Sequence, residues 1–442
     1  MLQKPYREDS SLSPAALYCS LMTPDIYTHT FANGLQLVVQ EMAWLPSVSF
    51  NLLLPFGAVT DPEGASGSAA VLAEWLDRGA GTRDSRTLSD DLDALGVRRG
   101  GGAGGESTVL SGSLLADTLP EALAIYADIV RRPHLKDAEF GPARTVALQE
   151  LASLDDSPTQ RLFIALSKTY FASAHGRSSY GEAADLEALS AESVRQDAAQ
   201  RLGPQGAILS VAGGVRSEEV KALVQNLFGD WSGAEVPLPE VQVNDTRTGH
   251  IAAQTSQTQI GVAYEALPPG HPDWYKNALS VAVLSKGMGS RLFAEVREKR
   301  GLVYSVTALG RAVRGYGYTL AYAGTTPERA PETLQVLLGE LSRLRDGVSA
   351  EELERARTGL LSSLVMEGES SGGVASGLAR NTFLFGAPRP LETVKAELSA
   401  VALGDLNGYL AERAEPRFTV LTLGPSALDA PAEPNSTEKV NA

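Results

Sequence analysis

The chain contains an internal duplication, which constrains its fold more than any other feature. One copy starts at Leu119 and reads LPEALAIYADIVRRPHLKDAEFGPARTVALQEL; the other starts at Ala330 and reads APETLQVLLGELSRLRDGVSAEELERARTGLLSSL. Both contain P-E-x-L, then A-E, then A-R-T, and matching residues lie 211 to 213 positions apart. Similarity at a fixed offset indicates structurally equivalent units. We therefore expect two homologous domains of roughly 200 residues each.

Each copy is predicted to hold strands, a short helix, further strands and then two long helices. Strands and helices are segregated along each copy, which is typical of an α+β fold with helices layered on one face of a sheet. Thr118 and Glu121 are also spaced as a helix capping box. The predicted strands are 35–39, 48–54, 108–115, 259–264, 303–309 and 317–323, and the helices are 86–95, 137–154, 274–284 and those starting at Leu119, Pro331 and Ser349.

Composition shifts along the chain suggest its domain limits. We expect an N-terminal domain over 24–228 and a C-terminal domain over 247–426, joined by a linker over 229–246 that is rich in Gly, Pro and acidic residues. The polar residues 427–442 are predicted to be a disordered tail. Residues 1–23 are predicted to be a flexible arm, or to precede a true start at Met22.

Charge and composition exclude several classes of protein. The 53 acidic residues outnumber the 38 basic ones, giving a net charge of −15, and no Lys/Arg run provides a phosphate-binding patch. Nucleic acid is therefore excluded as a partner. No stretch approaches the roughly 18 apolar residues of a membrane helix. Cys19 is the only cysteine, so no intrachain disulfide can form. We expect a cytoplasmic protein, with secretion as the alternative that the cysteine count leaves open.

The glycine-rich stretch RRGGGAGGES at 98–107 has two interpretations. Glycine loops can bind phosphate through backbone N–H groups. However, this stretch lacks the G-K-[ST] ending and falls between a predicted helix and a strand, the reverse of the order in phosphate-binding loops. We therefore favour a flexible loop or an edge strand, whose free backbone could pair with an extended peptide.

Two common catalytic signatures are missing. The five histidines are never closer than 21 residues, so no two can share a helical face as zinc ligands. No G-x-S-x-G nucleophile motif occurs either.

The stretch GSAAVLAEWLDRGA at 67–80 is predicted to be a helix that is apolar on nearly all sides, with Glu74 and Asp77 as its only acidic residues. Its residues alone predict a deeply buried structural helix.

That helix and its surroundings resemble the pitrilysin/insulinase-type zinc peptidases, the inverted zincins that include the mitochondrial processing peptidase. Active members carry G-x-A-H-x-x-E-H-x-L-x-x-G-[TA], which supplies two zinc histidines and a glutamate base. Aligned on Gly67 and Gly79, this chain has Ala70 and Glu74 at the histidine positions and Ala73 at the base. The family's third zinc ligand falls on Glu150, within VALQEL.

The resemblance therefore implies a degenerate zinc site. Two carboxylates, Glu74 and Glu150, are poor substitutes for two imidazoles on zinc. Ala73 provides no base to activate water. We expect no metal and no zinc-dependent hydrolysis in this chain alone, with the zinc held by a partner subunit.

A second motif, GSRLFAEVREKRGLVYSV at 289–306, contains Arg297 and Tyr304. Arg297 is predicted near the end of a helix stopped by Gly301, with Tyr304 opening the next strand, so the turn can bring both to one surface. A guanidinium can hold a carbonyl or carboxylate, and a phenol can donate to an oxyanion. On the residues alone, a solvated basic helix end followed by an ordinary strand aromatic remains the alternative. The resemblance implies that this pair holds the substrate.

The resemblance extends from Thr28 to Pro425 and implies two domains that enclose a peptide chamber. The family includes two-chain enzymes in which one subunit carries the zinc motif and the other carries the Arg/Tyr pair. We therefore expect a non-catalytic, substrate-binding subunit of a heteromeric zinc metallopeptidase, paired with a zinc-bearing paralogue. The alternatives are a structural scaffold subunit, like the core proteins of respiratory complexes, and a stand-alone peptide-binding homodimer.

Overall fold

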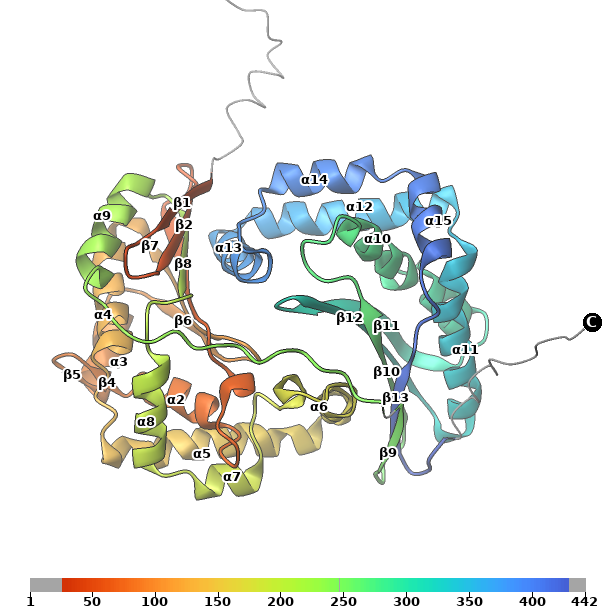
Figure 1. Cartoon of the computed structure of the whole chain (residues 1–442), viewed down its shortest axis with the longest axis horizontal. Coiled ribbons are helices and arrows are strands. Elements are labelled where there is room, and N and C mark those ends of the chain that lie inside the picture. Colours follow the sequence, from red (N-terminus) through yellow and green to blue (C-terminus); the bar gives the residue numbers. More distant parts are fainter. Residues whose placement is uncertain (1–25, 246, 429–442) are drawn as a thin grey trace, which may run out of the picture.

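The computed structural model describes residues 26–245 and 247–428, which form two β-sheets with helices packed around them (Figure 1). The predicted arm over 1–23 lies outside the described residues, as does the predicted tail over 427–442 beyond residue 428. Among the described residues, no helix is both long and apolar enough to cross a membrane.

The strand order of the second sheet, β9-β13-β10-β12-β11, repeats the order β2-β8-β3-β7-β6 of the first sheet, in which β1 is an additional edge strand. This repeat confirms the duplication. Each sheet has one parallel pair, β2 with β8 and β9 with β13, and its other neighbours are antiparallel. The strands are β1 (Ile26–Thr30), β2 (Gln36–Glu41), β3 (Ser47–Leu54), β6 (Arg98–Ala103), β7 (Thr108–Leu115), β8 (Ile208–Gly213), β9 (Thr248–Ala252), β10 (Thr258–Ala266), β11 (Val303–Val313), β12 (Tyr316–Thr325) and β13 (Thr419–Gly424), with a small hairpin of β4 (Gly79–Ala80) and β5 (Arg83–Asp84).

Helices cover the outer face of each sheet. On the first sheet, alternate residues of β3 such as Phe50, Leu52 and Leu54 are buried against α2, α4 and α9 in the larger core. The first half contains α2 (Ser68–Leu76), α3 (Ser85–Ala94), α4 (Leu119–Arg131), α5 (Asp137–Ser153), α6 (Pro158–Tyr170), α7 (Ala183–Ala188), α8 (Ala191–Arg201) and α9 (Ser217–Phe228). The second contains α10 (Trp274–Ser285), α11 (Ala330–Ser342), α12 (Ala350–Gly368), α13 (Ser371–Phe385), α14 (Leu391–Ala400) and α15 (Leu403–Glu412).

Each half also sends one helix across to the inner face of the other half's sheet (Figure 1). Helix α6 packs Leu162 and Leu166 against Leu421 in the second sheet. Helix α13 packs Leu378 and Phe383 against the first sheet. The expectation of helices on only one face of each sheet is therefore incomplete. Because both faces of β8 and β13 are covered, every residue of these two strands is buried.

Hydrogen bonds reinforce this exchange. The Ser210 hydroxyl donates to the Ala375 carbonyl of α13 (2.7 Å), and the hydroxyls of Tyr170 in α6 and Tyr316 in β12 are 2.8 Å apart. At the turn between β11 and β12, the backbone N–H of Arg314 donates to the Glu106 carboxylate of the first half (2.9 Å). The two halves thus meet through both core packing and polar contacts.

The predicted elements are present, with boundaries shifted by a few residues. The predicted capping box at Thr118 and Glu121 is wrong: residues 116–118 form a 3₁₀ turn, and the Thr118 hydroxyl donates to the Leu115 carbonyl instead (3.1 Å). Between α9 and β9 the described residues form neither helix nor strand, apart from one bridge between Phe171 and Val243. The domain limits of 24–228 and 247–426, with the linker over 229–246, stay predictions.

Candidate functional site

Helix α2 is buried except on one narrow stripe. It begins after Gly67, whose φ of +100° favours glycine, and the apolar residues predicted to be buried are buried. The two residues of α2 that are not fully buried are Ala70 and Glu74, one helical turn apart. These are the two positions that align with the zinc histidines, so the helix keeps an accessible face where an active enzyme would hold metal.

A buried ion pair fixes the start of α2. The Asp61 carboxylate accepts hydrogen bonds from the backbone N–H groups of Gly67 (2.7 Å) and Ala69 (2.9 Å). It also accepts from the Arg201 guanidinium (3.1 Å), and the two side chains are only 0% and 5% exposed. A second Arg201 nitrogen donates to the Thr60 carbonyl (2.9 Å). This network satisfies N–H groups that a helix N-terminus leaves free and sets the position of α2.

Glu74 and Glu150 lie on two helices that pack against one another, α2 and α5, and the charge of Glu150 acts on Glu74. Partial burial raises the pKa of the Glu74 carboxyl, and the nearby charges of Glu150 and Asp77 raise it further, while Arg78 lowers it. Two carboxylates that repel one another would be stabilised by a shared cation or proton. Glu150 itself is exposed to solvent.

The donor atoms at these positions do not fit a catalytic zinc. Ala70 and Ala73 carry no donor, and zinc peptidase sites use at least two imidazoles or thiolates. Across residues 26–245 and 247–428, no three His, Cys, Asp or Glu side chains are grouped so that they could hold a metal ion. Ala73, at the position of the family's general base, is buried and only 7% exposed.

Arg297 lies in a π-helical turn, Phe293–Glu298, and its side chain is exposed. Its basic neighbours Lys299 and Arg300 both donate to the Glu295 carboxylate, at 2.6 and 2.9 Å. Arg297 makes no ion pair within the described residues; its guanidinium carbon instead lies 4.9 Å from the centre of the Phe293 ring. Glu295 thus neutralises much of the positive charge at this helix end, while the charge of Arg297 has no carboxylate partner among the described residues.

Tyr304 is the extra residue of a β-bulge at the start of β11. Val303 pairs with Thr325 and Ser305 pairs with Gly324, which leaves Tyr304 without a partner in the ladder. A bulge turns a side chain out of the regular alternation. Tyr304 is accordingly 80% exposed, and its ring centre lies 5.9 Å from the Arg297 guanidinium carbon.

The sequence-predicted residues therefore form two pairs, Glu74 with Glu150 and Arg297 with Tyr304. No hydrogen bond, ion pair or aromatic contact joins one pair to the other in the part of the chain that the structure describes. The first pair belongs to the N-terminal half and the second to the C-terminal half. Each half thus carries one of the two predicted pairs.

The glycine-rich stretch forms β6, the edge strand of the first sheet. It pairs only with β7, its residues Arg98 to Gly102 are exposed, and it contacts α2. Gly101 has a φ of +124°, and a side chain there would lie 1.9 Å from the Val109 carbonyl oxygen, so this position requires glycine. The edge-strand interpretation is confirmed. A free strand edge beside the accessible stripe of α2 can pair with an extended chain.

Two cavities lie where the β11–β12 hairpin meets α13. One of about 610 Å³ reaches from the hairpin to β3, β7 and α6, and includes Glu106, His175 and Tyr318. The other, about 670 Å³, extends toward α10, α14 and the β2–β3 loop. Four residues line both cavities: Arg311, Ala312, Arg380 and Leu384. No sequence pattern predicted this junction, because its residues come from two elements that are distant along the chain.

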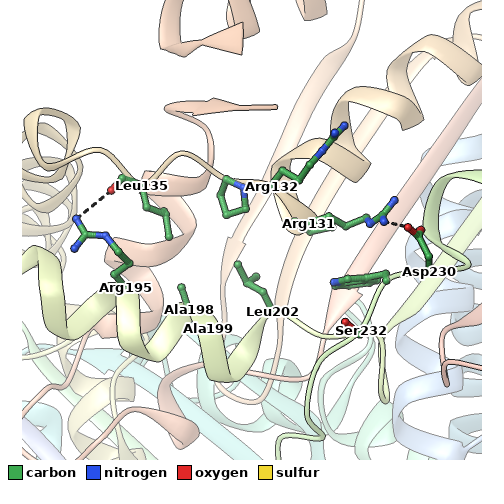
Figure 2. Close-up of a pocket in the computed structure, with 12 residues that line it drawn as sticks. Arg131, Arg132, Leu135, Arg195, Ala198, Ala199, Leu202, Asp230 and Ser232 are labelled. Carbon is green, nitrogen blue, oxygen red and sulfur yellow. Dashed lines mark hydrogen bonds and ion pairs between the residues drawn. The ribbon is translucent and has the colours of Figure 1, made fainter. Parts of the chain in front are cut away.

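A third cavity of about 350 Å³ lies between α4, α8 and residues 230–232 (Figure 2). Arg131 donates to Asp230 (2.6 Å) and Arg195 donates to the Leu135 carbonyl (3.3 Å), the two contacts drawn in Figure 2. Arg132 pairs with Asp128. Each arginine that lines it is thus paired, and none of the candidate residues above lines this cavity.

Two family models match consecutive ranges of the chain. Residues 37–182 match the model described as insulinase, peptidase family M16, and residues 188–360 match the model described as the peptidase M16 inactive domain. A Bacillus subtilis protein named as an uncharacterized zinc protease is 25% identical over 407 residues, covering 91% of this chain and 98% of that protein. A Mycobacterium bovis protein with a similar name is 27% identical over 406 residues, covering 90% and 92%.

Solved structures show the same fold. A structure described as a peptidase M16 inactive domain from Pseudomonas fluorescens has a TM-score of 0.83 at 20% identity, covering 92% of this chain and 100% of that one. A protease from Helicobacter pylori has a TM-score of 0.82 at 19% identity, covering 90% and 99%. A chain of Complex III2 from Candida albicans has a TM-score of 0.80 at 14% identity, covering 91% and 96%.

These matches confirm the resemblance that the degenerate helix and the Arg/Tyr motif indicated. The two family models match consecutive ranges, in the order that the duplicated halves follow along the chain. The shared sheet topology agrees with this assignment. The chain therefore belongs to the insulinase-type M16 peptidase family.

Proposed function

We propose that this chain is a non-catalytic, substrate-binding subunit of a heteromeric zinc metallopeptidase that acts on peptides. The observation that carries the proposal is the contrast between the two pairs. The accessible stripe of α2 carries Ala70 and Glu74 in place of metal-binding imidazoles, whereas Arg297 and Tyr304 are exposed and Arg297 makes no ion pair with any described residue. Such a chain can hold a substrate but has no group to activate water. The zinc would belong to the partner subunit.

Arg297 and Tyr304 would act on the peptide bond that the partner cleaves. A guanidinium fork holds a peptide carbonyl in one orientation, and a phenolic O–H donates to the oxyanion that forms as water attacks. The cation–aromatic contact between them limits the freedom of both side chains before substrate arrives. In this role they complete an active chamber whose chemistry is supplied by the other chain.

The edge strand β6 supports a role in holding the peptide. Its outer backbone groups have no strand partner within the described residues, and the strand lies against α2. An extended peptide could add to this edge and gain main-chain hydrogen bonds regardless of its sequence. We include β6 in the proposed substrate path for this reason.

The experiment is a reconstitution. Cleavage of a mixed fluorogenic peptide library is measured for this chain alone, for the H-x-x-E-H-bearing paralogue of the same organism alone, and for the two together. Activity that appears only in the mixture supports the proposal. Full activity of the paralogue alone, or zinc-dependent activity of this chain alone, would overturn it.

Two alternatives make different predictions in the same experiment. A structural scaffold, a role suggested by the shared fold of a Complex III2 chain, would leave the activity of the paralogue unchanged. A stand-alone peptide-binding homodimer would bind peptides without any second protein. The retained and unpaired Arg297 favours the subunit role over the scaffold. A cytoplasmic location, suggested by the single cysteine, belongs to this proposal as well.

A further inference from the structure

We propose that the junction between the two inner cavities binds an acidic side chain of the peptide, flanked on both sides by apolar residues, and that Arg311 recognises it. This inference rests on the proposed function and adds a substrate class to it. The junction consists of Arg311 and Ala312 on β11 with Arg380 and Leu384 on α13, the residues that line both cavities.

Arg311 carries an available positive charge. It lies directly across from Tyr318 in the β11–β12 ladder, and residues opposite one another in an antiparallel pair share a face of the sheet. Tyr318 lines the cavity of about 610 Å³, so Arg311 is on the inner face as well. The side chain is exposed and makes no hydrogen bond or ion pair within residues 26–245 and 247–428.

Most other charged residues around the cavities have charged partners. Glu106 accepts from the Arg314 backbone N–H and lies 3.3 Å from His175. On the other side, Arg389 pairs with Glu397, and Glu392 pairs with Lys395. Arg177 donates to the neutral Asp61 backbone carbonyl and keeps its charge, but it lines only the cavity of about 610 Å³ and not the junction. Arg311 is therefore the junction residue that makes no ion pair with any described residue.

Arg380 adds a second cation at the same junction. Its guanidinium lies 3.4 Å from the Glu367 carboxylate, but the two side chains are 61% and 43% exposed. An exposed pair of this kind contributes little and is screened by salt. A carboxylate from a peptide could thus contact Arg380 together with Arg311, which suits a single acidic side chain better than a neutral amide.

Apolar walls continue on both sides of the two arginines. The smaller cavity is lined by Phe163, Tyr318 and Phe383. The larger is lined by Trp44, Trp274 and Phe385, the last two being in edge-to-face contact with ring centres 5.6 Å apart. Cavities of this size and lining are typical of sites that bury apolar groups. The occupant that fits is a peptide segment with one acidic residue between apolar or aromatic ones.

This preference runs against the charge of the whole chain. With a net charge of −15, the protein as a whole repels acidic peptides. The junction would attract an acidic side chain only at short range, so the position of the acidic residue within the peptide should affect binding. If net charge alone governed binding, the chain would prefer basic peptides. The two explanations therefore predict opposite preferences in the test.

The test measures binding of fluorescently labelled peptides to the full chain by anisotropy. The peptides are identical except for a central residue between leucine and phenylalanine, which is Glu, Gln or Lys. We expect the wild type to bind the Glu peptide about tenfold more tightly than the Gln peptide. Arg311→Gln should reduce this preference to within about twofold, and Arg311→Lys should keep part of it.

The matched control is Arg86→Gln, since the Arg86 side chain is 90% exposed on α3 and lines neither cavity. It should bind like the wild type. Equal binding of the Glu and Gln peptides by the wild type, or an unchanged Glu preference in Arg311→Gln, would overturn the inference while leaving the proposed subunit role standing. If none of the peptides binds, peptide binding by this chain is overturned as well.

Discussion

The Arg297 guanidinium carbon lies 5.9 Å from the centre of the Tyr304 ring, although one residue belongs to a π-helical turn and the other to a β-bulge. Both irregularities add a residue to a regular element, and both turn a side chain toward solvent. Backbone irregularities of this kind are frequent at functional sites. Arg297 and Tyr304 are therefore exposed on the same surface, where both could contact one substrate.

In the proposed subunit role, replacing either residue should impair the assembled peptidase without affecting assembly. Tyr304→Phe would remove the proposed donor to the developing oxyanion, so we expect kcat of the complex to fall by about 10²-fold. Arg297→Ala should lower kcat/KM by at least about tenfold, because the carbonyl is no longer held. Peptide cleavage and size-exclusion chromatography of the complex measure both effects.

The control for these variants is Arg300→Ala in the same turn. Arg300 is held by the Glu295 carboxylate and backbone carbonyl, so its loss should leave turnover within about twofold. If Arg300→Ala and Arg297→Ala lower turnover equally, the general positive charge of this helix end matters and the specific role of Arg297 is rejected.

Introducing the zinc motif of active family members into α2 should create a zinc site. In the variant Ala70→His/Ala73→Glu/Glu74→His, two imidazoles on the accessible stripe of α2 would face Glu150, whose charge acts on Glu74 in the wild type. We expect about one zinc ion per chain in the purified variant, measured by elemental analysis after dialysis. The wild type treated in the same way is the reference.

Adding Glu150→Gln to that variant should remove most of the bound zinc, because a carboxylate ligand is replaced by a neutral amide. A triple variant that folds normally by circular dichroism but binds no zinc would show that Glu150 is not positioned as the third ligand. That result would also reject the alignment of residues 67–80 with the zinc helix.

Several parts of this structure could be predicted from the sequence because local patterns determine them. The duplicated A-R-T segments, the alternation in β7 and the all-round apolar surface of α2 each predict a structure that does not depend on the rest of the chain. The exchange of α6 and α13 could not be predicted in this way. Neither helix was among the predicted elements, and even a helical pattern that turned Leu378 and Phe383 toward a core would not show which of two similar sheets supplies that core.

The same distinction between local motifs and long-range packing decides which site residues could be predicted. Arg297 and Tyr304 are seven residues apart, so one local motif contains both. The junction of Arg311 and Arg380 joins a strand to a helix that has crossed between the halves, and neither residue stands in a recognisable motif. The bulge at Tyr304 was equally hidden, because VYSVT has ordinary strand composition and the extra residue shows only in the pairing with β12.

Breaking the Asp61–Arg201 pair should destabilise the first half strongly. Asp61→Ala leaves two helix N–H groups without an acceptor and the buried Arg201 guanidinium with only the Asp197 carboxylate, 3.6 Å away, so we expect a loss of about 2–4 kcal/mol in the free energy of unfolding. Glu63→Ala, at an exposed position two residues away, is the matched control and should have little effect. Urea unfolding followed by circular dichroism measures both; similar midpoints for the two variants would contradict the structural role of the pair.

Acid should weaken the start of α12 through Glu352. The Arg291 guanidinium donates to both Glu352 carboxylate oxygens (2.6 and 2.9 Å), and with the Ser349 N–H it lowers the pKa of Glu352 to about 2. Because the folded state favours the ionised form, this stabilisation is complete above the usual carboxyl pKa and is lost as the pH falls toward 2.

The difference in stability between the wild type and Glu352→Gln should therefore shrink with acid. We expect roughly 2–3 kcal/mol at pH 7, an upper estimate for a side chain that is 20% exposed, and distinctly less at pH 3. Glu351→Gln, in the same helical turn but with an 80% exposed side chain, is the control and should show a small difference at both pH values. Urea midpoints at the two pH values provide the measurement. A Glu352→Gln difference that is equally large at pH 3 would show that the contact stabilises α12 through its shape and hydrogen bonds, with no contribution from the carboxylate charge.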